Sequence, residues 1–159
     1  SPDWRGTEGW IRFNQPLLYL GNKITGIELW FEKGRVVKSR AKTNQALLHN
    51  MIATKDADKV GEFSLTDKRF SRIEKFMAHT LFDENVGGAH GNTHIALGMA
   101  YKEAYTGDIK KVTPKKWKEL GFNDSTVHTD IISTAPRTVT ATLKNDTKKV
   151  IYKNGMFTV

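Results

Sequence analysis

The chain has 159 residues, no cysteine and a formal net charge of +8 at pH 7. This length predicts a single domain, or a piece of a larger chain, that buries about two thirds of its unfolded surface. Without cysteine the chain can form neither a disulfide framework nor a thiolate metal site, and it suits a reducing compartment such as the cytoplasm. No apolar run approaches the roughly 20 residues of a transmembrane helix, and no signal peptide opens the sequence, so we expect no membrane partner. Because Ser1 stands in place of methionine, we expect an excised or processed segment.

The excess of basic residues makes a nucleic-acid-binding module the alternative function for this chain. Most of the basic residues are lysines scattered through turns and strand ends. Proteins that bind nucleic acid more often cluster them on one element, together with arginine and stacking aromatics. The densest block, residues 110–116, coincides with the start of a helix and indicates a solvated face. We therefore expect no nucleic-acid partner.

Antiparallel strands are predicted for the first forty residues. Aromatic and branched residues are concentrated in three runs, which span residues 10–20, 23–31 and 35–40. The dipeptides Gly21-Asn22 and Lys33-Gly34 separate these runs and are typical of tight turns. This part of the chain is therefore expected to form a meander of strands.

Two helices are predicted from periodicity and capping residues. Residues 43–52 place their apolar side chains on one helical face, and Thr43 suits the N-cap position. In the second helix Thr113 can cap, Pro114 suits the first helical position, and Gly121 suits the end.

The remaining segments predict turns, loops and further strands. In chain order they are a turn at 56–59, a strand from residue 60, a charged loop at 67–72, and strands at 73–80, 93–101, 125–133, 138–143 and 149–152. In the strand interpretation of 93–101, Tyr101 must lie just past the strand end if it shares a site with His94. A helix, which would place both on one face by their seven-residue spacing, is the alternative. The whole predicts one α+β domain with a mixed, largely antiparallel sheet and a few short helices.

The stretch from residue 81 to residue 101 gathers polar side chains around a glycine-rich bend. Glycine accepts backbone angles that other residues resist, so Gly87, Gly88 and Gly91 allow a sharp turn here. Carboxylates and imidazoles that converge suit a divalent transition metal. A solvated turn is the alternative for this segment. The polar residues around the bend are Asp83, Glu84, His90, His94 and Tyr101.

A second polar pair lies on the strand predicted for residues 125–133. In a strand, His128 and Asp130 project to the same face, while Val127 and Ile131 point the other way, towards a core. This pair can bind a metal, although a surface histidine with a neighbouring acid is the alternative. Glu62, at the head of an apolar run, is a third candidate, with an ordinary exposed acid at a strand end as its alternative.

Six sequence motifs relate the chain to a known family. They are SPDWRGTEGWIRFNQP (1–16), KITGIELWFEKGRVV (23–37), VGEFSLTD (60–67), TLFDEN (80–85), THIALGMAY (93–101) and GFNDSTVHTD (121–130). In this order they resemble the C-terminal part of the M29 metalloaminopeptidases, a thermophilic aminopeptidase family. The link from FDEN to HIALG is longer here than in many members, so we align His94 with the family ligand and treat His90 as an extra residue.

The resemblance implies a hydrolase, a co-catalytic two-metal exopeptidase that releases N-terminal residues from peptides. By this resemblance Glu62 is the candidate bridging carboxylate and Tyr101 the hydroxyl donor to the developing oxyanion, which makes both catalytic candidates. Each metal-binding histidine would also be oriented by an acceptor at its other ring nitrogen, for which the candidates are Asn92, Asn123 and Asp124. The residues that match the family metal site are Glu62, Glu84, His94, His128 and Asp130.

The same resemblance sets the expected metals, partners and completeness of the chain. It implies two divalent ions (zinc, cobalt, manganese or magnesium), a peptide substrate and a homodimer. In the family, an N-terminal α/β domain and one more metal-binding glutamate precede the segment that matches Ser1. Residues 1–159 are therefore expected to be the C-terminal, metal-binding domain of a two-domain enzyme, and to be catalytically incomplete alone.

Overall fold

The structure is a computed structural model that describes residues 1–159 except for the side chain of Thr80. Its three α-helices are α1 (Gln45–Ala53), α2 (Thr80–Asp83) and α3 (Pro114–Glu119), and its short 3-10 helices are η1 (Trp4–Gly6), η2 (Lys102–Ala104) and η3 (Ile109–Lys111). The strands are β1 (Gly9–Arg12), β2 (Leu17–Tyr19), β3 (Asn22–Ile24), β4 (Glu28–Glu32), β5 (Arg35–Arg40), β6 (Val60–Thr66), β7 (Asn92–Gly98), β8 (His128–Ser133), β9 (Thr138–Thr142), β10 (Lys148–Lys153) and β11 (Met156–Phe157).

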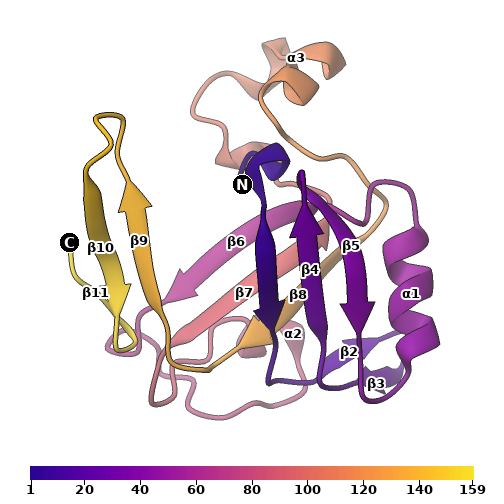
Figure 1. The fold of residues 1–159 in the computed structure, drawn as a ribbon, viewed down its shortest axis with the longest axis vertical. Helices are drawn as coiled ribbons and strands as arrows, with labels where there is room; N and C mark the ends of the chain where they lie inside the picture. The colour runs from indigo at the N-terminus through magenta and orange to yellow at the C-terminus, as the bar shows by residue number, and fades with distance from the viewer.

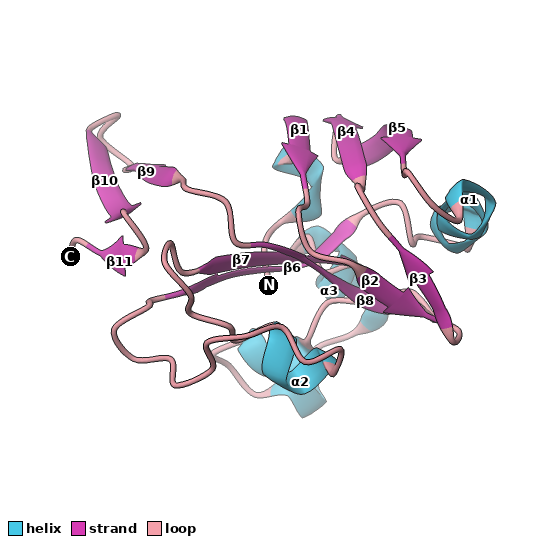
Figure 2. Ribbon diagram, turned by 90° about the horizontal axis from the view of Figure 1, so that it is seen from below, coloured by secondary structure: helices cyan, strands magenta, loops and turns pink.

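The strands form layers around a central sheet in the order β6-β7-β8. A second sheet, β1-β4-β5, lies over one face of the central sheet, and α2 lies on the opposite face (Figure 1; Figure 2). The strands β9, β10 and β11 form a separate sheet, and β2 and β3 form a hairpin. Each pairing between these strands is antiparallel. The predicted α+β, largely antiparallel fold is confirmed, with the strands divided among several sheets.

The hydrophobic core fills the space between the two main sheets and under α1. Because side chains alternate along a strand, Ile95 and Leu97 of β7 enter this core while His94 and Ala96 point to the other face. In the same way Val127 and Ile131 belong to the core, as the alternation predicted. Other core residues, from both sheets and α1, are Phe13, Leu29, Phe31, Leu48 and Met51.

The strand predicted for residues 10–20 is wrong, because it is two strands. Pro16 has no backbone N–H to donate to a ladder and stands between β1, which ends at Arg12, and β2, which begins at Leu17. The amide of Phe13 instead bonds the carbonyl of Ile27. The chain thus changes from one sheet to the β2-β3 hairpin within a few residues.

The strand predicted for residues 73–80 is also wrong. The carboxylate of Asp83 accepts hydrogen bonds from the amides of Met77 (2.6 Å) and His79 (2.7 Å). Those amides are therefore used by a local side chain and cannot join a ladder. The segment runs as irregular chain into α2, which begins at Thr80.

The predicted helices are present, and their starts differ in detail. Thr113 caps α3 through its hydroxyl, which accepts from the amide of Lys116, as the sequence predicted. Residue Asn44 occupies the N-cap of α1 in a left-handed conformation, and the Thr43 hydroxyl instead accepts from the amide of Thr25. In the first helix the predicted cap is therefore one residue too early.

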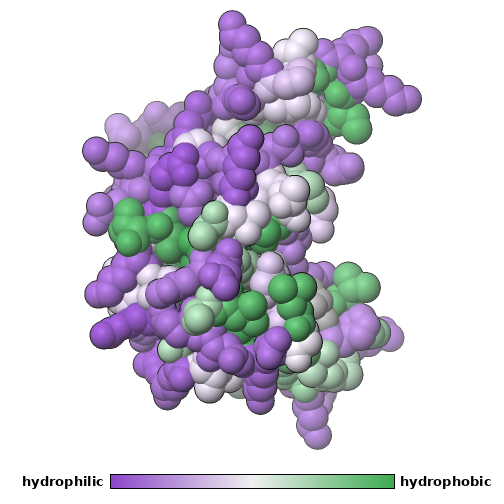
Figure 3. Space-filling model, turned by 90° about the vertical axis from the view of Figure 1, so that its right-hand side faces the viewer, coloured by the Kyte–Doolittle hydropathy of each residue, from purple (hydrophilic) through white to green (hydrophobic). Residues whose placement is uncertain are grey.

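The molecular surface is mainly hydrophilic on the side that carries α1, where apolar side chains form separate patches (Figure 3). Such scattered apolar residues are normal for a folded domain. Within the part of the chain that the structure describes, every helix is too short or too polar to cross a bilayer.

Candidate metal centre

A bulge in β6 turns Glu62 away from the hydrophobic core. Val60 lies opposite Leu97, and Glu62 lies opposite Ala96, so the pairing register shifts between residues 60 and 62. In a regular strand residues 60 and 62 would share one face. Because Gly61 is an extra residue, Val60 enters the core while Glu62 projects from the other face.

Glycine at position 61 is required by the close approach of the neighbouring chain. A Cβ there would overlap the carbonyl oxygens of Gly98 and Met99. Glycine inside a strand pattern is a known signal of a bulge or a close backbone approach. Gly61 therefore indicated in the sequence that a bulge could turn the Glu62 carboxylate to the other face, and the prediction for this strand did not use that signal.

The two histidines are held by backbone carbonyls through their Nδ1 atoms. Nδ1 of His94 donates to the carbonyl oxygen of Glu84 (3.0 Å), and Nδ1 of His128 donates to that of Met99 (2.7 Å). Because a carbonyl oxygen only accepts, Nδ1 carries the proton in both neutral rings. Both Nε2 lone pairs are thereby left free to bind a metal, which is the usual arrangement at protein metal sites.

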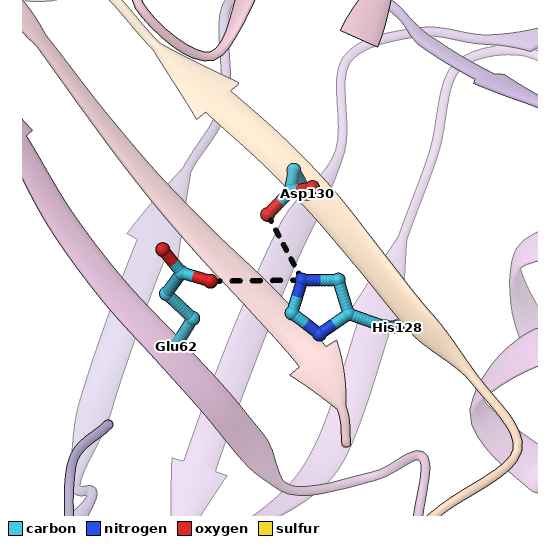
Figure 4. Close-up of side chains that lie close together, drawn as sticks. All are labelled: Glu62, His128 and Asp130. Carbon is cyan, nitrogen blue, oxygen red and sulfur yellow. Dashed lines mark ion pairs between the residues drawn. The ribbon is translucent and has the colours of Figure 1, made fainter. Parts of the chain in front are cut away.

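Both Nε2 atoms face the same group of carboxylates. Glu62 directs Oε1 to Nε2 of His94 (3.2 Å) and Oε2 to Nε2 of His128 (3.6 Å). The oxygen Oδ1 of Asp130 lies 3.9 Å from Nε2 of His94 and 3.6 Å from Nε2 of His128. Figure 4 shows the Glu62 and Asp130 carboxylates each pointing an oxygen at the same nitrogen of the His128 ring. The pair predicted on β8 therefore meets Glu62 across the sheet.

Two sets of three potential ligands share Asp130. Glu62, His128 and Asp130 form one set, and Glu84, His94 and Asp130 form the other, each with ligand atoms within 4.8 Å of one another. The structure thus brings together all five residues that the sequence assigned to metal binding. We call the first set the His128 half and the second set the His94 half.

The concentration of negative charge in the site shifts the pKa values of two of its residues. Desolvation and the nearby charge of Asp130 raise the pKa of Glu84 above its ordinary value. The Asp130 carboxylate beside the ring raises the pKa of His128, against the opposing effect of burial. Negative charges in partial burial repel one another and attract a cation. The site therefore favours positive charge.

Tyr101 lies beside this cluster, just beyond the end of β7, as the strand interpretation required. Its ring centroid is 4.5 Å from that of His128. Desolvation, followed by the charges of Asp130 and Glu62, raises the pKa of Tyr101. The hydroxyl therefore stays protonated at neutral pH and remains a hydrogen-bond donor.

Two residues that the sequence placed near the bend lie outside both ligand sets. Asp83 is buried and its carboxylate bonds the amides of Met77 and His79, so it organises the turn before Glu84. His90 is exposed. Its carbonyl accepts a hydrogen bond from the hydroxyl of Tyr152 (3.4 Å).

The acceptors expected for the histidines are wrong. We expected Asn92, Asn123 or Asp124, whereas the carbonyls of Glu84 and Met99 fill that role. Backbone carbonyls carry no sequence signature, so this part of the site could not be found from residue types. Both asparagines are nevertheless buried nearby. The amide of Asn92 donates to the same Glu84 carbonyl, and the amide of Asn123 donates to the carbonyl of Gly98.

The residues of the site fit a bound divalent cation. Oδ1 of Asp130 is buried and has no hydrogen-bond partner among the described residues, which is costly for a carboxylate oxygen. Cations beside this oxygen would satisfy it, and each would also accept the Nε2 lone pair of one histidine. Oxygen and imidazole ligands of this kind accept zinc, cobalt or manganese.

Comparisons with known proteins identify the family of this chain. The model of the family described as thermophilic metalloprotease (M29) matches residues 1–157. This chain belongs to the M29 family. It is 30% identical to aminopeptidase PepS of Streptococcus thermophilus over 159 residues, and 31% identical to aminopeptidase 2 of Geobacillus stearothermophilus over 158 residues.

The M29 relatives are longer than this chain. The matches cover 98% and 97% of the chain but 37% of the length of each of these two relatives. The fold is also similar to the structure of wild-type AmpT from Thermus thermophilus, with a TM-score of 0.83 and 28% identity over 98% of this chain and 38% of that one. The M29 resemblance found in the sequence motifs is thus confirmed.

Proposed function

We propose that this chain forms the metal-binding part of an M29 aminopeptidase that releases N-terminal residues from peptides with water activated by two divalent cations. The observation that carries the proposal is the pair of ligand sets that share Asp130. A nucleic-acid-binding module, the alternative raised by the charge of +8, gains nothing from converging carboxylates, because they repel phosphate.

The two histidines and three carboxylates divide the work of holding the cations. His94 and Glu84 serve one cation, and His128 serves the other. Glu62 presents one oxygen to each histidine, which supports its assignment as a bridging carboxylate, and Asp130 is common to both sets. When bound, two cations lower the pKa of water and polarise the scissile carbonyl.

The side chains of this chain supply the remaining parts of the reaction. Tyr101 stays protonated and donates a hydrogen bond to the oxyanion that develops on the peptide carbonyl. Glu62 and Asp130 orient the attacking water by accepting its hydrogen bonds. A free amine at the peptide N-terminus is cationic and is attracted to the same carboxylates, which favours cleavage at the chain end.

We extend the proposal to the setting of the enzyme, as the family resemblance implies. It acts in the cytoplasm as a homodimer with zinc, cobalt, manganese or magnesium, and it works with parts of a longer protein. Size-exclusion chromatography with light scattering would test the dimer. Metal analysis of protein purified without added metal would identify the resident ion.

The test of this function combines metal content with peptide cleavage. Asp130→Ala should abolish tight metal binding because Asp130 belongs to both ligand sets, and His128→Ala should abolish it in the His128 half. His49→Ala on α1, an exposed histidine outside the site, should leave metal binding unchanged. Aminopeptidase activity of the natural protein should fall in parallel on aminoacyl reporter substrates. Unchanged metal stoichiometry in both site variants, with circular dichroism showing intact folding, would contradict the assignment.

A further inference from the structure

Two buried asparagines hold the backbone on which the site histidines rest. Asn92 of β7 is 0% exposed, and Asn123, in the loop before β8, is 3% exposed. Each points its side-chain Nδ2 at two backbone carbonyl oxygens. Burying an amide is costly unless it is hydrogen-bonded, so these contacts fix both segments firmly.

Asn92 acts on the carbonyl that anchors His94. Its Nδ2 donates to the carbonyl oxygen of Glu84 (2.6 Å) and to that of Asp83 (3.3 Å). The Glu84 oxygen also accepts from Nδ1 of His94, so one carbonyl binds both side chains. Glu84 itself is a ligand in the His94 half. Asn92 therefore fixes the position of two of the three ligands in that half.

Asn123 stands in the same relation to the other histidine. Its Nδ2 donates to the carbonyl oxygens of Gly98 and Asp56, both at 2.6 Å. The backbone carbonyl of Asn123 accepts from the amide of Ala100 (3.0 Å). These bonds hold the residues on both sides of Met99, and the carbonyl of Met99 orients His128.

We propose that Asn92 and Asn123 are positioning residues, each of which sets the cation affinity of one half of the centre. Asn92 controls the His94 half and Asn123 controls the His128 half. The inference rests on the proposed two-cation function and adds residues that touch no ligand atom. Groups that orient metal ligands typically change metal affinity by about 10–100-fold when they are removed.

The decisive experiment isolates each half by removing the histidine of the other. In His128→Ala protein, cobalt titration followed by absorption spectroscopy reports the His94 half. There Asn92→Ala should weaken cobalt binding about 10–100-fold, as expected for groups that orient ligands, and Asn123→Ala should change it less than about two-fold. In His94→Ala protein the two asparagine variants should exchange their effects, so each serves as the control for the other.

A structural role alone predicts a different pattern. Loss of a buried hydrogen bond lowers the unfolding midpoint in EDTA for either variant, without selecting one half. Equal weakening of both halves by each asparagine variant, or no weakening in either, would overturn the inference. If Asn92→Ala or Asn123→Ala fails to fold, the serine variants give the same comparison. Absence of cobalt binding in the unaltered chain would instead overturn the two-cation function itself.

Discussion

Replacing Asp130 with asparagine should have opposite effects on stability with and without metal. In the metal-free protein this carboxylate is 8% exposed and shares the site with the carboxylates of Glu62 and Glu84. Asparagine keeps the shape of the side chain, removes the charge and adds an N–H donor for a neighbouring carboxylate. Asp130→Asn should therefore stabilise the metal-free protein and remove its stabilisation by metal.

The size of the effect follows from the distances in the site. Two unit charges within 4.8 Å of each other repel by about 3.5 kcal/mol at an effective dielectric constant of about 20. Partial exposure and salt reduce this to about 1 kcal/mol for each of the two carboxylate pairs. The free energy of unfolding in EDTA should thus rise by about 1–2 kcal/mol, which raises the midpoint of a domain of this size by about 2–8 °C.

The assay is thermal unfolding at about pH 9, where an ordinary imidazole is neutral. Unaltered protein and Asp130→Asn are compared in EDTA and then in excess zinc. A ligand at 100 times its dissociation constant adds about 2.7 kcal/mol to the stability of the unaltered protein, and the variant should lack this gain. A midpoint for Asp130→Asn below that of the unaltered protein in EDTA would refute the reasoning, because it would show that the carboxylate stabilises the empty site.

Four further expectations concern pH, the bulge, His90 and the open site. Because the pKa of His128 is raised in the folded state, its ionisation contributes stability that is fully present below about pH 6.5 and is lost as pH rises through the folded pKa. The free energy of unfolding of the metal-free protein should therefore fall over that range. His128→Gln should make this free energy less dependent on pH. Gly61→Ala forces a Cβ against neighbouring carbonyls and should cost about 1–3 kcal/mol in urea unfolding; an unchanged midpoint would show that the chain relaxes there. His90→Ala should keep the full metal content measured by mass spectrometry, since its side chain is exposed, and loss of a metal would show that the alignment across the glycine-rich link is wrong. The 159-residue chain alone should give negligible turnover of an aminoacyl reporter, because Tyr101 is 45% exposed and water weakens electrostatic stabilisation, whereas robust turnover would contradict this.

Local pattern was enough to predict the parts of the site that lie on one strand. The alternating pattern predicted that His128 and Asp130 share one face of the strand and that Ile131 points into the core. Strand β8 shows both features. Strand alternation, with a helix as the alternative, also required Tyr101 to lie just past the strand end if it shares the site, and it lies just beyond β7. These features depend only on neighbours in the sequence, so a two-residue period determines them.

The meeting of candidate ligands from different elements of the fold could not be derived in this way. Glu62 and Glu84 were assigned by resemblance, because nothing local shows which strand pairs with which, or in what register. The bulge at Gly61 shows the difficulty, since regular alternation would have placed Glu62 on the same face as the buried Val60. The strand wrongly predicted for 73–80 failed for a related reason: its amides bond the carboxylate of Asp83, several residues further along.

The arrangement of β7 explains how such a costly site is tolerated. One face of the strand carries Ile95 and Leu97 into the core, so burial of apolar surface holds the strand whatever occupies the other face. On that other face, His94 is 4% exposed and meets the carboxylates, which repel one another without a cation. The geometry of the proposed ligands is therefore imposed by the core and the backbone carbonyls. When the ligands of a site are already in place, little binding free energy is lost to their rearrangement. This favours tight and geometrically selective binding.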